Sequence, residues 1–401
     1  MEKVLQLDLF ISAGIGVLAL LIGMYITRKV HFLKRFCIPA PVSGGLIISL
    51  VTLLLHSVFK VECTFDGTVK DLCMMLFFTS VGFQSDIKVF RKGGKQILRM
   101  IGLVAVLIVA QNLVSLGIAR GLGMDPLFAM ATGSIPMSGG HGTAGGFSPL
   151  LSELGLAGAD SITMAAATFG LVAGSILGGP LGEALIRRHH LDKITANEDA
   201  SDAQPEPVAS EEKSLRDYLH GSSALFIAMA MGSCLSKLLA LTGISFPTYF
   251  GALLVACTLR NLLGLSPKWE KELSADAITS IGTICLQFFL GMAMASLRLW
   301  ELASLALPLT LILLSQVAFM ALYAAFVAFP LLGKDYDGAI LVSGICGFGL
   351  GATPNAMANM SAICYKYRYA VKPFIIVPII GAMFVDLINT GVVTIFLNCI
   401  H

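Results

Sequence analysis

Two glycine-rich segments place polar side chains where an otherwise apolar chain cannot continue a helix. The first reads Ser134-Ile-Pro-Met-Ser-Gly-Gly-His-Gly-Thr143, and the second reads Gly347-Phe-Gly-Leu-Gly-Ala-Thr-Pro-Asn355. Proline and runs of glycine interrupt helices, and backbone groups freed at membrane depth must be satisfied by protein or by a water-filled cavity. Helix N-termini at such breaks favour anions, and unwound carbonyl groups can hold sodium ions. These segments are therefore candidates for binding a small charged ligand.

The second segment carries the signature of a helix start, since Thr353 suits the N-cap and Pro354 suits the first helical position. Thr143 holds the matching place in the first segment. We therefore predict two re-entrant hairpins whose half-helices begin at one common site. The candidate substrate-binding residues of these turns are Ser138, Gly139, Gly140, His141, Gly142, Thr143, Gly349, Gly351, Thr353, Pro354 and Asn355. The alternative interpretation is that the glycines only allow helices to pack closely.

Asp386 is the one acidic residue near the middle of a predicted membrane span, and Asn389 follows it on the same helix face. Ionisable residues inside a membrane are costly and usually functional. Asp386 could ligate a cation, pair with a substrate ammonium group or form a structural hydrogen bond, and we add both residues to the candidate site. His141 could sense protons, bind substrate or be structural. No Lys or Arg falls at mid-depth, so an anionic substrate would be held by helix N-termini, hydroxyl and amide groups, and bound cations.

The composition places these residues in a membrane. Apolar residues make up 56% and charged residues 13% of the 401, against about 45–50% and about 25% in soluble proteins. Ten segments meet or approach the ~20 apolar residues that a membrane-spanning helix needs. They are 8–27, 42–58, 71–85, 100–119, 161–186, 219–241, 246–262, 277–294, 303–330 and 373–397. We predict an all-α polytopic membrane protein. The net charge of +2 does not indicate nucleic-acid binding.

The distribution of Lys and Arg predicts the orientation of the spans. If both termini lie outside the cytoplasm, 21 of the 27 basic residues fall in cytoplasmic segments. Residues 189–217 are polar, contain two prolines and hold few apolar side chains. Such a segment cannot bury enough apolar surface to offset its ordering entropy, so we predict a disordered cytoplasmic linker.

The chain repeats itself at a shift of about 206–211 residues. In order, the matches are Pro41–Gly45 with Pro247–Gly251, Phe77–Phe78 with Phe288–Phe289, Gln111 with Gln316, Gly123–Asp125 with Gly333–Asp335, and Gly139–Thr143 with Gly349–Thr353. We predict an N-terminal repeat at 1–188 and a C-terminal repeat at 218–401, each with five transmembrane helices and one hairpin. An odd number of crossings inverts the second repeat relative to the first. Inverted repeats with broken helices at matching positions are typical of transporters.

Several motifs resemble segments of the bacterial sodium/glutamate symporter family. They are Ser138–Thr143, Ala167–Gly170, Leu299–Pro308, Gly347–Pro354 and Ala358–Met360. The resemblance extends over essentially the whole chain. It implies Na⁺-coupled uptake of L-glutamate by a homodimer in the bacterial inner membrane, with periplasmic termini and an elevator-like movement. The candidate sodium ligands are Ser134, Ser138, Thr143, Thr353 and Asp386.

Three alternatives are compatible with these features. A Na⁺-coupled symporter of the same architecture could carry another small carboxylate, such as citrate or malate, although Asp386 offers a partner for the ammonium group of an amino acid. Ser138 and His141 could serve an intramembrane hydrolase, but three-residue spacing across glycines does not establish a nucleophile–base pair, and no orienting acid is evident. A channel is the third alternative, since carbonyl-lined loops also build selectivity filters.

Overall fold

The computed structural model describes residues 3–86, 88–191, 215–243, 245–266 and 273–400, and most of these residues are helical. The N-terminal half contains β1 (Lys3–Leu7), α1 (Leu9–Lys29), α2 (His31–Arg35), α3 (Ala40–Phe59), β2 (Val61–Phe65), α4 (Thr68–Gln84), α5 (Lys88–Gly121), α6 (Pro126–Thr132), α7 (Ser134–Met137), α8 (Gly140–Glu153) and α9 (Ala159–Arg188). The C-terminal half contains α10 (Leu215–Ala240), α11 (Phe250–Leu263), α13 (Ala275–Ala295), η3 (Leu299–Leu305), α14 (Ala306–Tyr323), η4 (Ala324–Ala328), α15 (Phe329–Leu331), α16 (Tyr336–Gly349), α17 (Thr353–Lys366), α18 (Val371–Ile379), η5 (Ile380–Phe384) and α19 (Val385–Ile400). Most of the predicted linker at 189–217 lies outside the described residues.

Seven helical segments within the described residues are long and apolar enough to cross a membrane. They are Leu9–Lys29, Ala40–Phe59, Lys95–Gly121, Ala159–Arg188, Leu215–Ala240, Ala275–Ala295 and Ala306–Leu331. These segments coincide with seven of the ten predicted spans, and the chain is a multi-pass membrane protein. The other three predicted spans are helical but short or interrupted. α4 has 17 residues, α11 has 14, and the π-helical turn η5 separates α18 from α19.

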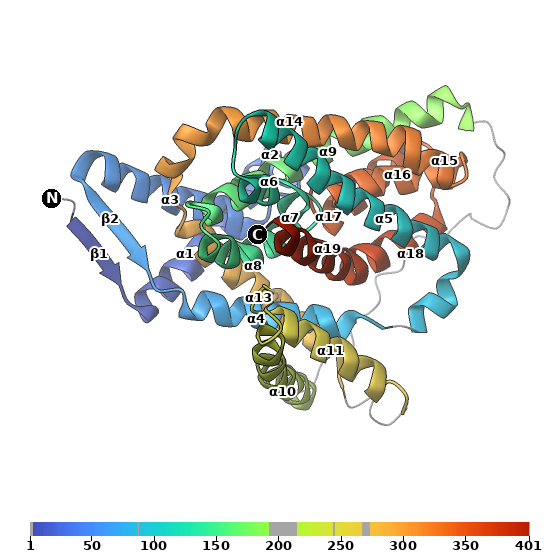
Figure 1. Cartoon of the computed structure of the whole chain (residues 1–401). Helices are drawn as coiled ribbons and strands as arrows, with labels where there is room; N and C mark the ends of the chain where they lie inside the picture. Colours follow the sequence, from blue (N-terminus) through green and yellow to red (C-terminus); the bar gives the residue numbers. More distant parts are fainter. Residues whose placement is uncertain (1–2, 87, 192–214, 244, 267–272, 401) are drawn as a thin grey trace.

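The prediction of an all-α chain needs one correction, because β1 and β2 form a parallel two-stranded sheet in which Leu5 pairs with Cys63. Apolar and polar residues alternate in Val61-Glu-Cys-Thr-Phe65, which is the pattern of a strand, so the signal was present. The sheet lies at one end of the molecule (Figure 1). Next to it, the backbone N–H of Asp66 donates to the Ser12 hydroxyl at 2.9 Å, which ties the start of α4 to α1.

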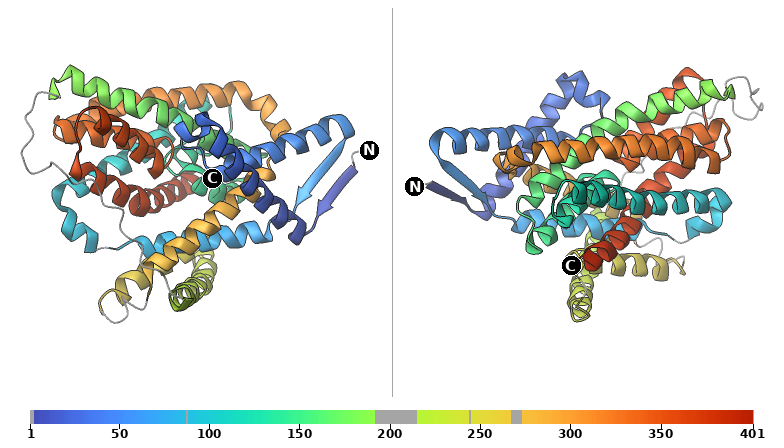
Figure 2. Two further views of the ribbon diagram at one scale, coloured as in Figure 1. Left: turned by 180° about the vertical axis from the view of Figure 1, so that it is seen from behind. Right: turned by 45° about the horizontal axis from the view of Figure 1, so that its top comes forward.

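The helices gather into two bundles, and each bundle draws on both halves of the chain (Figures 1 and 2). α1, α3, α4, α10, α11 and α13 pack mainly on one another, and we call them the six-helix bundle. α5–α9 and α14–α19 also pack mainly on one another, and we call them the hairpin bundle because they include both interrupted segments. The chain crosses from the first bundle to the second after α4 and again after α13.

The six-helix bundle contains the same close helix contact twice. A Cβ atom added at Gly44 of α3 would lie 2.6 Å from the backbone nitrogen of Gly23 in α1. A Cβ atom added at Gly251 of α11 would lie 2.2 Å from the carbonyl oxygen of Gly232 in α10. Only glycine leaves room for a partner backbone at such distances. The two contacts join corresponding helix pairs of the two halves, although Gly251 matches Gly45 and not Gly44 in the sequence repeat.

Both interrupted segments begin with the same turn. Gly123 and Gly333 have positive φ angles of 66° and 118°, and Asp125 and Asp335 follow them two residues later. Each Asp carboxylate accepts a hydrogen bond from a backbone N–H in the first helical turn, at 2.7 Å in both cases. The two Asp residues are therefore the N-caps of α6 and α16. A sequence match thus corresponds here to a shared local structure.

Candidate functional site

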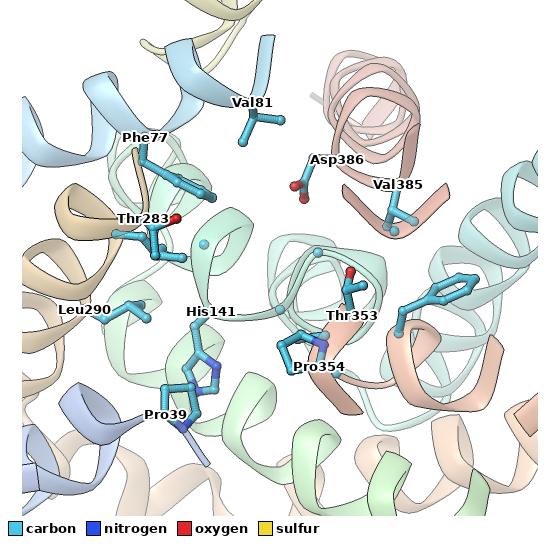
Figure 3. A pocket seen from close by; sticks show the side chains of 18 of the residues that line it. Pro39, Phe77, Val81, His141, Thr283, Leu290, Thr353, Pro354, Val385 and Asp386 are labelled. Carbon is cyan, nitrogen blue, oxygen red and sulfur yellow. The ribbon is translucent and has the colours of Figure 1, made fainter. Parts of the chain in front are cut away.

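A cavity of about 410 Å³ lies between the two bundles. Phe77, Val81 and Thr283 of the six-helix bundle form one wall, while Thr353 and Asp386 of the hairpin bundle face it (Figure 3). Nine of the thirteen candidate substrate-binding residues line this cavity: Ser138, Gly139, Gly140, His141, Gly142, Gly351, Thr353, Pro354 and Asp386. The other four lie outside the lining: Thr143, Gly349, Asn355 and Asn389.

The two interrupted segments meet at this cavity. Gly140, which follows α7, has a φ angle of 60°, and a Cβ atom added there would lie 2.7 Å from the carbonyl oxygen of Gly351. Gly351 belongs to the turn between α16 and α17. These two helices lie side by side, because Gly347 leaves room for the backbone of Ala356. The chain therefore reverses direction at the cavity, and this turn touches the turn of the first segment.

Gln111 of α5 ties the two turns to each other. Its Nε2 donates to the carbonyl oxygen of Gly349 at 2.7 Å, and its Oε1 accepts from the Ser138 hydroxyl at 2.6 Å. The side-chain amide Nε2 of Gln316 in α14 in turn donates to the main-chain carbonyl oxygen of Gln111 at 2.8 Å. Both glutamines are fully buried, where such bonds are strong. Because the Ser138 hydroxyl donates to Gln111, it does not form the pair with His141 that a hydrolase needs.

The imidazole ring of His141 is held by α9. Its Nε2 lies 2.9 Å from the hydroxyl oxygen of Thr168, and that hydroxyl donates to the Met164 carbonyl oxygen at 2.8 Å. Since the single hydroxyl proton of Thr168 is used in this way, the oxygen accepts from a protonated Nε2. The ring is 5% exposed and lies at the edge of the cavity (Figure 3). A positioning contact with α9 thus fixes the orientation of His141.

Asp386 follows the π-helical turn that interrupts the last predicted span. It is the second residue of α19, directly after η5, and π-turns are rare and frequent at functional sites. The Thr143 hydroxyl donates to Asp386 Oδ1 at 3.0 Å, and Asn389 Nδ2 donates to the Ser134 carbonyl oxygen at 3.0 Å. The face shared by Asp386 and Asn389 therefore contacts the first interrupted segment at two points.

The prediction that Thr143 begins a helix, like Thr353, is wrong. α17 begins at Thr353, one residue earlier than predicted, because Ala352 and not Thr353 is its N-cap. α8 begins at Gly140, so Thr143 is fully buried inside that helix. The difference arises because the positive φ angle of Gly140 reverses the chain three residues earlier. Thr143 consequently supports Asp386 from behind and does not line the cavity.

Asn355 does not line the cavity, but it holds a helix that does. Its Nδ2 donates to the carbonyl oxygen of Leu171 in α9 at 2.7 Å. Asn359, one turn further along α17, donates to the carbonyl oxygen of Gly174 at 3.0 Å. These two bonds hold α17, and with it the turn that precedes Thr353, against α9.

Oxygen atoms with unused acceptor capacity lie near Asp386. Within the described part of the chain, the Ser134 hydroxyl and Asn389 Oδ1 are buried without a hydrogen-bond partner. The Thr353 hydroxyl faces η5, where a Cβ atom added at Gly381 would lie 2.3 Å from it. Hydroxyl, amide and carboxylate oxygens are the ligands that hard cations prefer. The arrangement therefore suits a sodium ion.

The site predicted from the sequence lacks the wall that the six-helix bundle contributes. Thr279, Thr283 and Gln287 of α13 and Gln84 of α4 line the cavity. The first three recur every fourth residue in an apolar helix, and this spacing was a detectable signal of a polar face. Among the described lining residues, Asp386 carries the one carboxylate and none is Lys or Arg.

A cavity at the meeting point of two interrupted segments, among helices of membrane-spanning length, is typical of a secondary transporter. The profile of the sodium/glutamate symporter family matches residues 5–369. The sodium/glutamate symporter of Escherichia coli (strain K12) is 38% identical over 399 residues, 98% of each chain, and that of Haemophilus influenzae is 35% identical over 384 residues, 95% of each chain. The chain belongs to the sodium/glutamate symporter family, and it is a transport protein rather than an enzyme.

Among solved structures, a sodium proton antiporter from Methanocaldococcus jannaschii is similar with a TM-score of 0.45 and 13% identity. The alignment covers 98% of this chain and 94% of that one. This likeness is too distant to carry an argument about fold or function.

Proposed function

We propose that the protein carries L-glutamate into the cell together with Na⁺, as a secondary active transporter of the bacterial inner membrane. The observation that carries this proposal is the meeting of two interrupted segments beside Asp386, in a chain of the sodium/glutamate symporter family. The curated relatives are named for transport of the same ion and the same amino acid.

The cavity offers a partner for each polar group of an amino-acid substrate. Asp386 suits the ammonium group. The first turns of α8, from Gly140, and of α17, from Thr353, supply backbone N–H donors for carboxylates. Since no described lining residue is Lys or Arg, the remaining positive charge must come with the coupling ion.

Sodium ions are transported with the substrate, and we assign their ligands around Asp386. Ser134, Thr353 and Asn389 offer side-chain oxygens there, and Thr143 orients the carboxylate. Moving one charge through 100 mV involves about 2.3 kcal/mol. An inside-negative potential opposes entry of an anion by that amount, so more than one accompanying Na⁺ is needed to reverse the sign.

The same proposal includes a topology and a movement. Residues 1–188 and 218–401 are inverted repeats, each with a re-entrant hairpin, both termini are periplasmic, and the linker at 189–217 is cytoplasmic. The hairpin bundle moves past the six-helix bundle in an elevator-like manner, within a homodimer. The supporting observations are that the cavity lies between the bundles and that Gln111 and Asn389 link the elements of the hairpin bundle to one another.

Uptake of radiolabelled L-glutamate into proteoliposomes tests the proposal. Gradients of Na⁺, Li⁺, K⁺ and protons are imposed one at a time, and liposomes without protein are the control. We expect saturable uptake with the Na⁺ gradient alone, accelerated by an inside-negative potential. Non-saturable uptake would indicate a channel, and stronger competition by citrate or malate than by unlabelled glutamate would assign another carboxylate as substrate.

A further inference from the structure

We propose that Thr279, Thr283 and Gln287 of α13 form a polar stripe that lines the path by which Na⁺ and substrate leave the site. This inference rests on the proposed function, because it assigns an exit route to the same cavity. The stripe faces the two interrupted segments across that cavity, and Thr283 lies on the side opposite Thr353 (Figure 3).

The three residues of the stripe lie on one face of α13 and follow the helix axis over a definite length. Residues four apart lie on one face of a helix, and all three side chains line the cavity. With a rise of 1.5 Å per residue, the stripe extends for about 12 Å. Leu286 and Leu290 complete the same wall, so polar groups form one row beside an apolar row.

The hydrogen bonds of the stripe leave acceptors directed at the cavity. The Thr279 hydroxyl donates to the Ala275 carbonyl oxygen at 2.9 Å, and the Thr283 hydroxyl donates to the Thr279 carbonyl oxygen at 2.8 Å. Each hydroxyl therefore keeps lone pairs for a ligand or for water. The half-buried Gln287 side chain makes no hydrogen bond to another described residue. A polar amide in apolar surroundings is costly unless water or a ligand satisfies it.

The matching face of α4 shows that packing does not require this polarity. At the shift that pairs Phe77 with Phe288, the stripe corresponds to Thr68, Leu72 and Leu76. Two of the three polar positions are thus leucines in the other half. α4 and α13 pack on each other in the same bundle. The polar residues of α13 are therefore explained by the cavity that this helix lines and not by helix packing.

The stripe runs towards the end of the cavity at which we place the cytoplasm. Thr279 lies near the start of α13, and Gln84, the last residue of α4, shares the lining. Pro39, just before α3, is at the same cavity. Basic residues lie next to this end of the cavity, at Lys34–Arg35 before α3, and in the proposed orientation they are cytoplasmic.

The variant Thr279→Val/Thr283→Val/Gln287→Met removes the polar groups while nearly keeping the volume. We expect Na⁺-dependent binding of labelled glutamate to the purified variant to stay within twofold of the original protein. Uptake into proteoliposomes should be slower by about tenfold, since a lost hydrogen bond for the moving ligand raises the barrier it crosses. Thr283→Ser should restore part of the rate. Thr258→Val in α11 is the matched control, because Thr258 makes the same intrahelical bond, to Leu254, outside the cavity.

Two outcomes would overturn the stripe as an exit path. One is uptake by the triple variant at the original rate. The other is loss of binding in parallel with uptake, which would make the stripe part of the binding site itself. Absence of Na⁺-driven uptake in the unmodified protein would instead refute the proposed function, so the two failures are distinguishable. If the triple variant does not fold, Thr283→Val alone is compared with Thr283→Ser by the same two measurements.

Discussion

α9 and the α18–α19 run hold corresponding places, since each follows the interrupted segment of its half, but they are built differently. α9 is one helix of 30 residues, whereas a π-helical turn that ends two residues before Asp386 interrupts the second run. At the positions in α9 that match Asp386 and Asn389, the chain has Ser175 and Gly178. The Ser175 hydroxyl donates to the Leu171 carbonyl oxygen of its own helix at 3.1 Å.

The glycines of α9 indicate that this helix serves for close packing. They recur every fourth residue and face α16 and α17, at Gly170, Gly174, Gly178 and Gly182. A Cβ atom added at Gly170 would lie 2.3 Å from the Leu350 carbonyl oxygen, and one at Gly178 would lie 2.1 Å from Asn359 Nδ2. One member of the pair therefore supports the second hairpin by close packing, and the other provides a charged group at the cavity. The two runs thus match in their places along the chain, whereas the charged group lies on one of them.

The largest effect that this comparison predicts is at Asp386. Asp386→Asn keeps the size of the side chain but removes the charge that an ion or ammonium group would meet in a low-dielectric site. Leaving a buried charge without its partner costs about 3–5 kcal/mol, so we expect Na⁺-driven uptake to fall by about 100-fold or more. Ser175→Ala, at the matching position, should change uptake by less than twofold.

Both variants are measured as purified protein in proteoliposomes, with thermal unfolding as the check on folding. Sodium dependence of the original strength in Asp386→Asn would remove Asp386 from the site. An equal loss in Ser175→Ala would show that both positions serve the same purpose, and the contrast between the two helices would be abandoned.

A smaller effect is expected on the supporting side of the pair. In Gly178→Ala the added methyl group meets Asn359, which donates to the Gly174 carbonyl oxygen. Overpacking of this kind typically costs about 1–3 kcal/mol, so Tm should fall by several degrees and uptake should fall with the amount of folded protein. Gly179 has no atom within 4 Å of the added Cβ position, so Gly179→Ala is the matched control. A Tm for Gly178→Ala equal to that of the control would refute close packing as the role of these glycines.

Much of the site could be predicted because its residues obey local rules. α17 begins at the predicted turn, although Ala352 is its N-cap and Thr353 and Pro354 are its first two residues. Asn389 shares the face of Asp386 because residues three apart do so on a helix. The positions of the two interrupted segments followed from Pro136 and the glycine runs.

The rest depends on tertiary contacts that sequence patterns do not encode. The bond from Gln111 to Gly349 requires the rotation of α5 relative to a turn far along the chain. The π-helical turn before Asp386 follows Pro378 and contains Gly381, which indicate a weakened helix there but do not specify a π-turn. The spacing of the α13 threonines indicates a polar face, but that this face lines a cavity depends on tertiary packing, because a threonine that bonds to its own helix is also common in ordinary membrane helices.

The smallest expected effect concerns the connection between the halves. α3 packs on α13, α4 on α11 and α9 on α16, so the halves are joined by extensive helix contacts as well as by the chain. Residues 195–210 have the composition of a segment without a core. Replacing them by a Gly/Ser sequence of equal length should leave the uptake rate within about 20% of the original, since flexible Gly/Ser chains span the same distance without specific contacts. Proteolytic cleavage at a site placed inside that sequence extends the test, because the two fragments should copurify and still transport glutamate if packing alone holds the halves in register. A loss of uptake in the uncut replacement, at unchanged expression and Tm, would instead assign a specific role to the linker, and the comparison of the two halves would then have to include the segment between them.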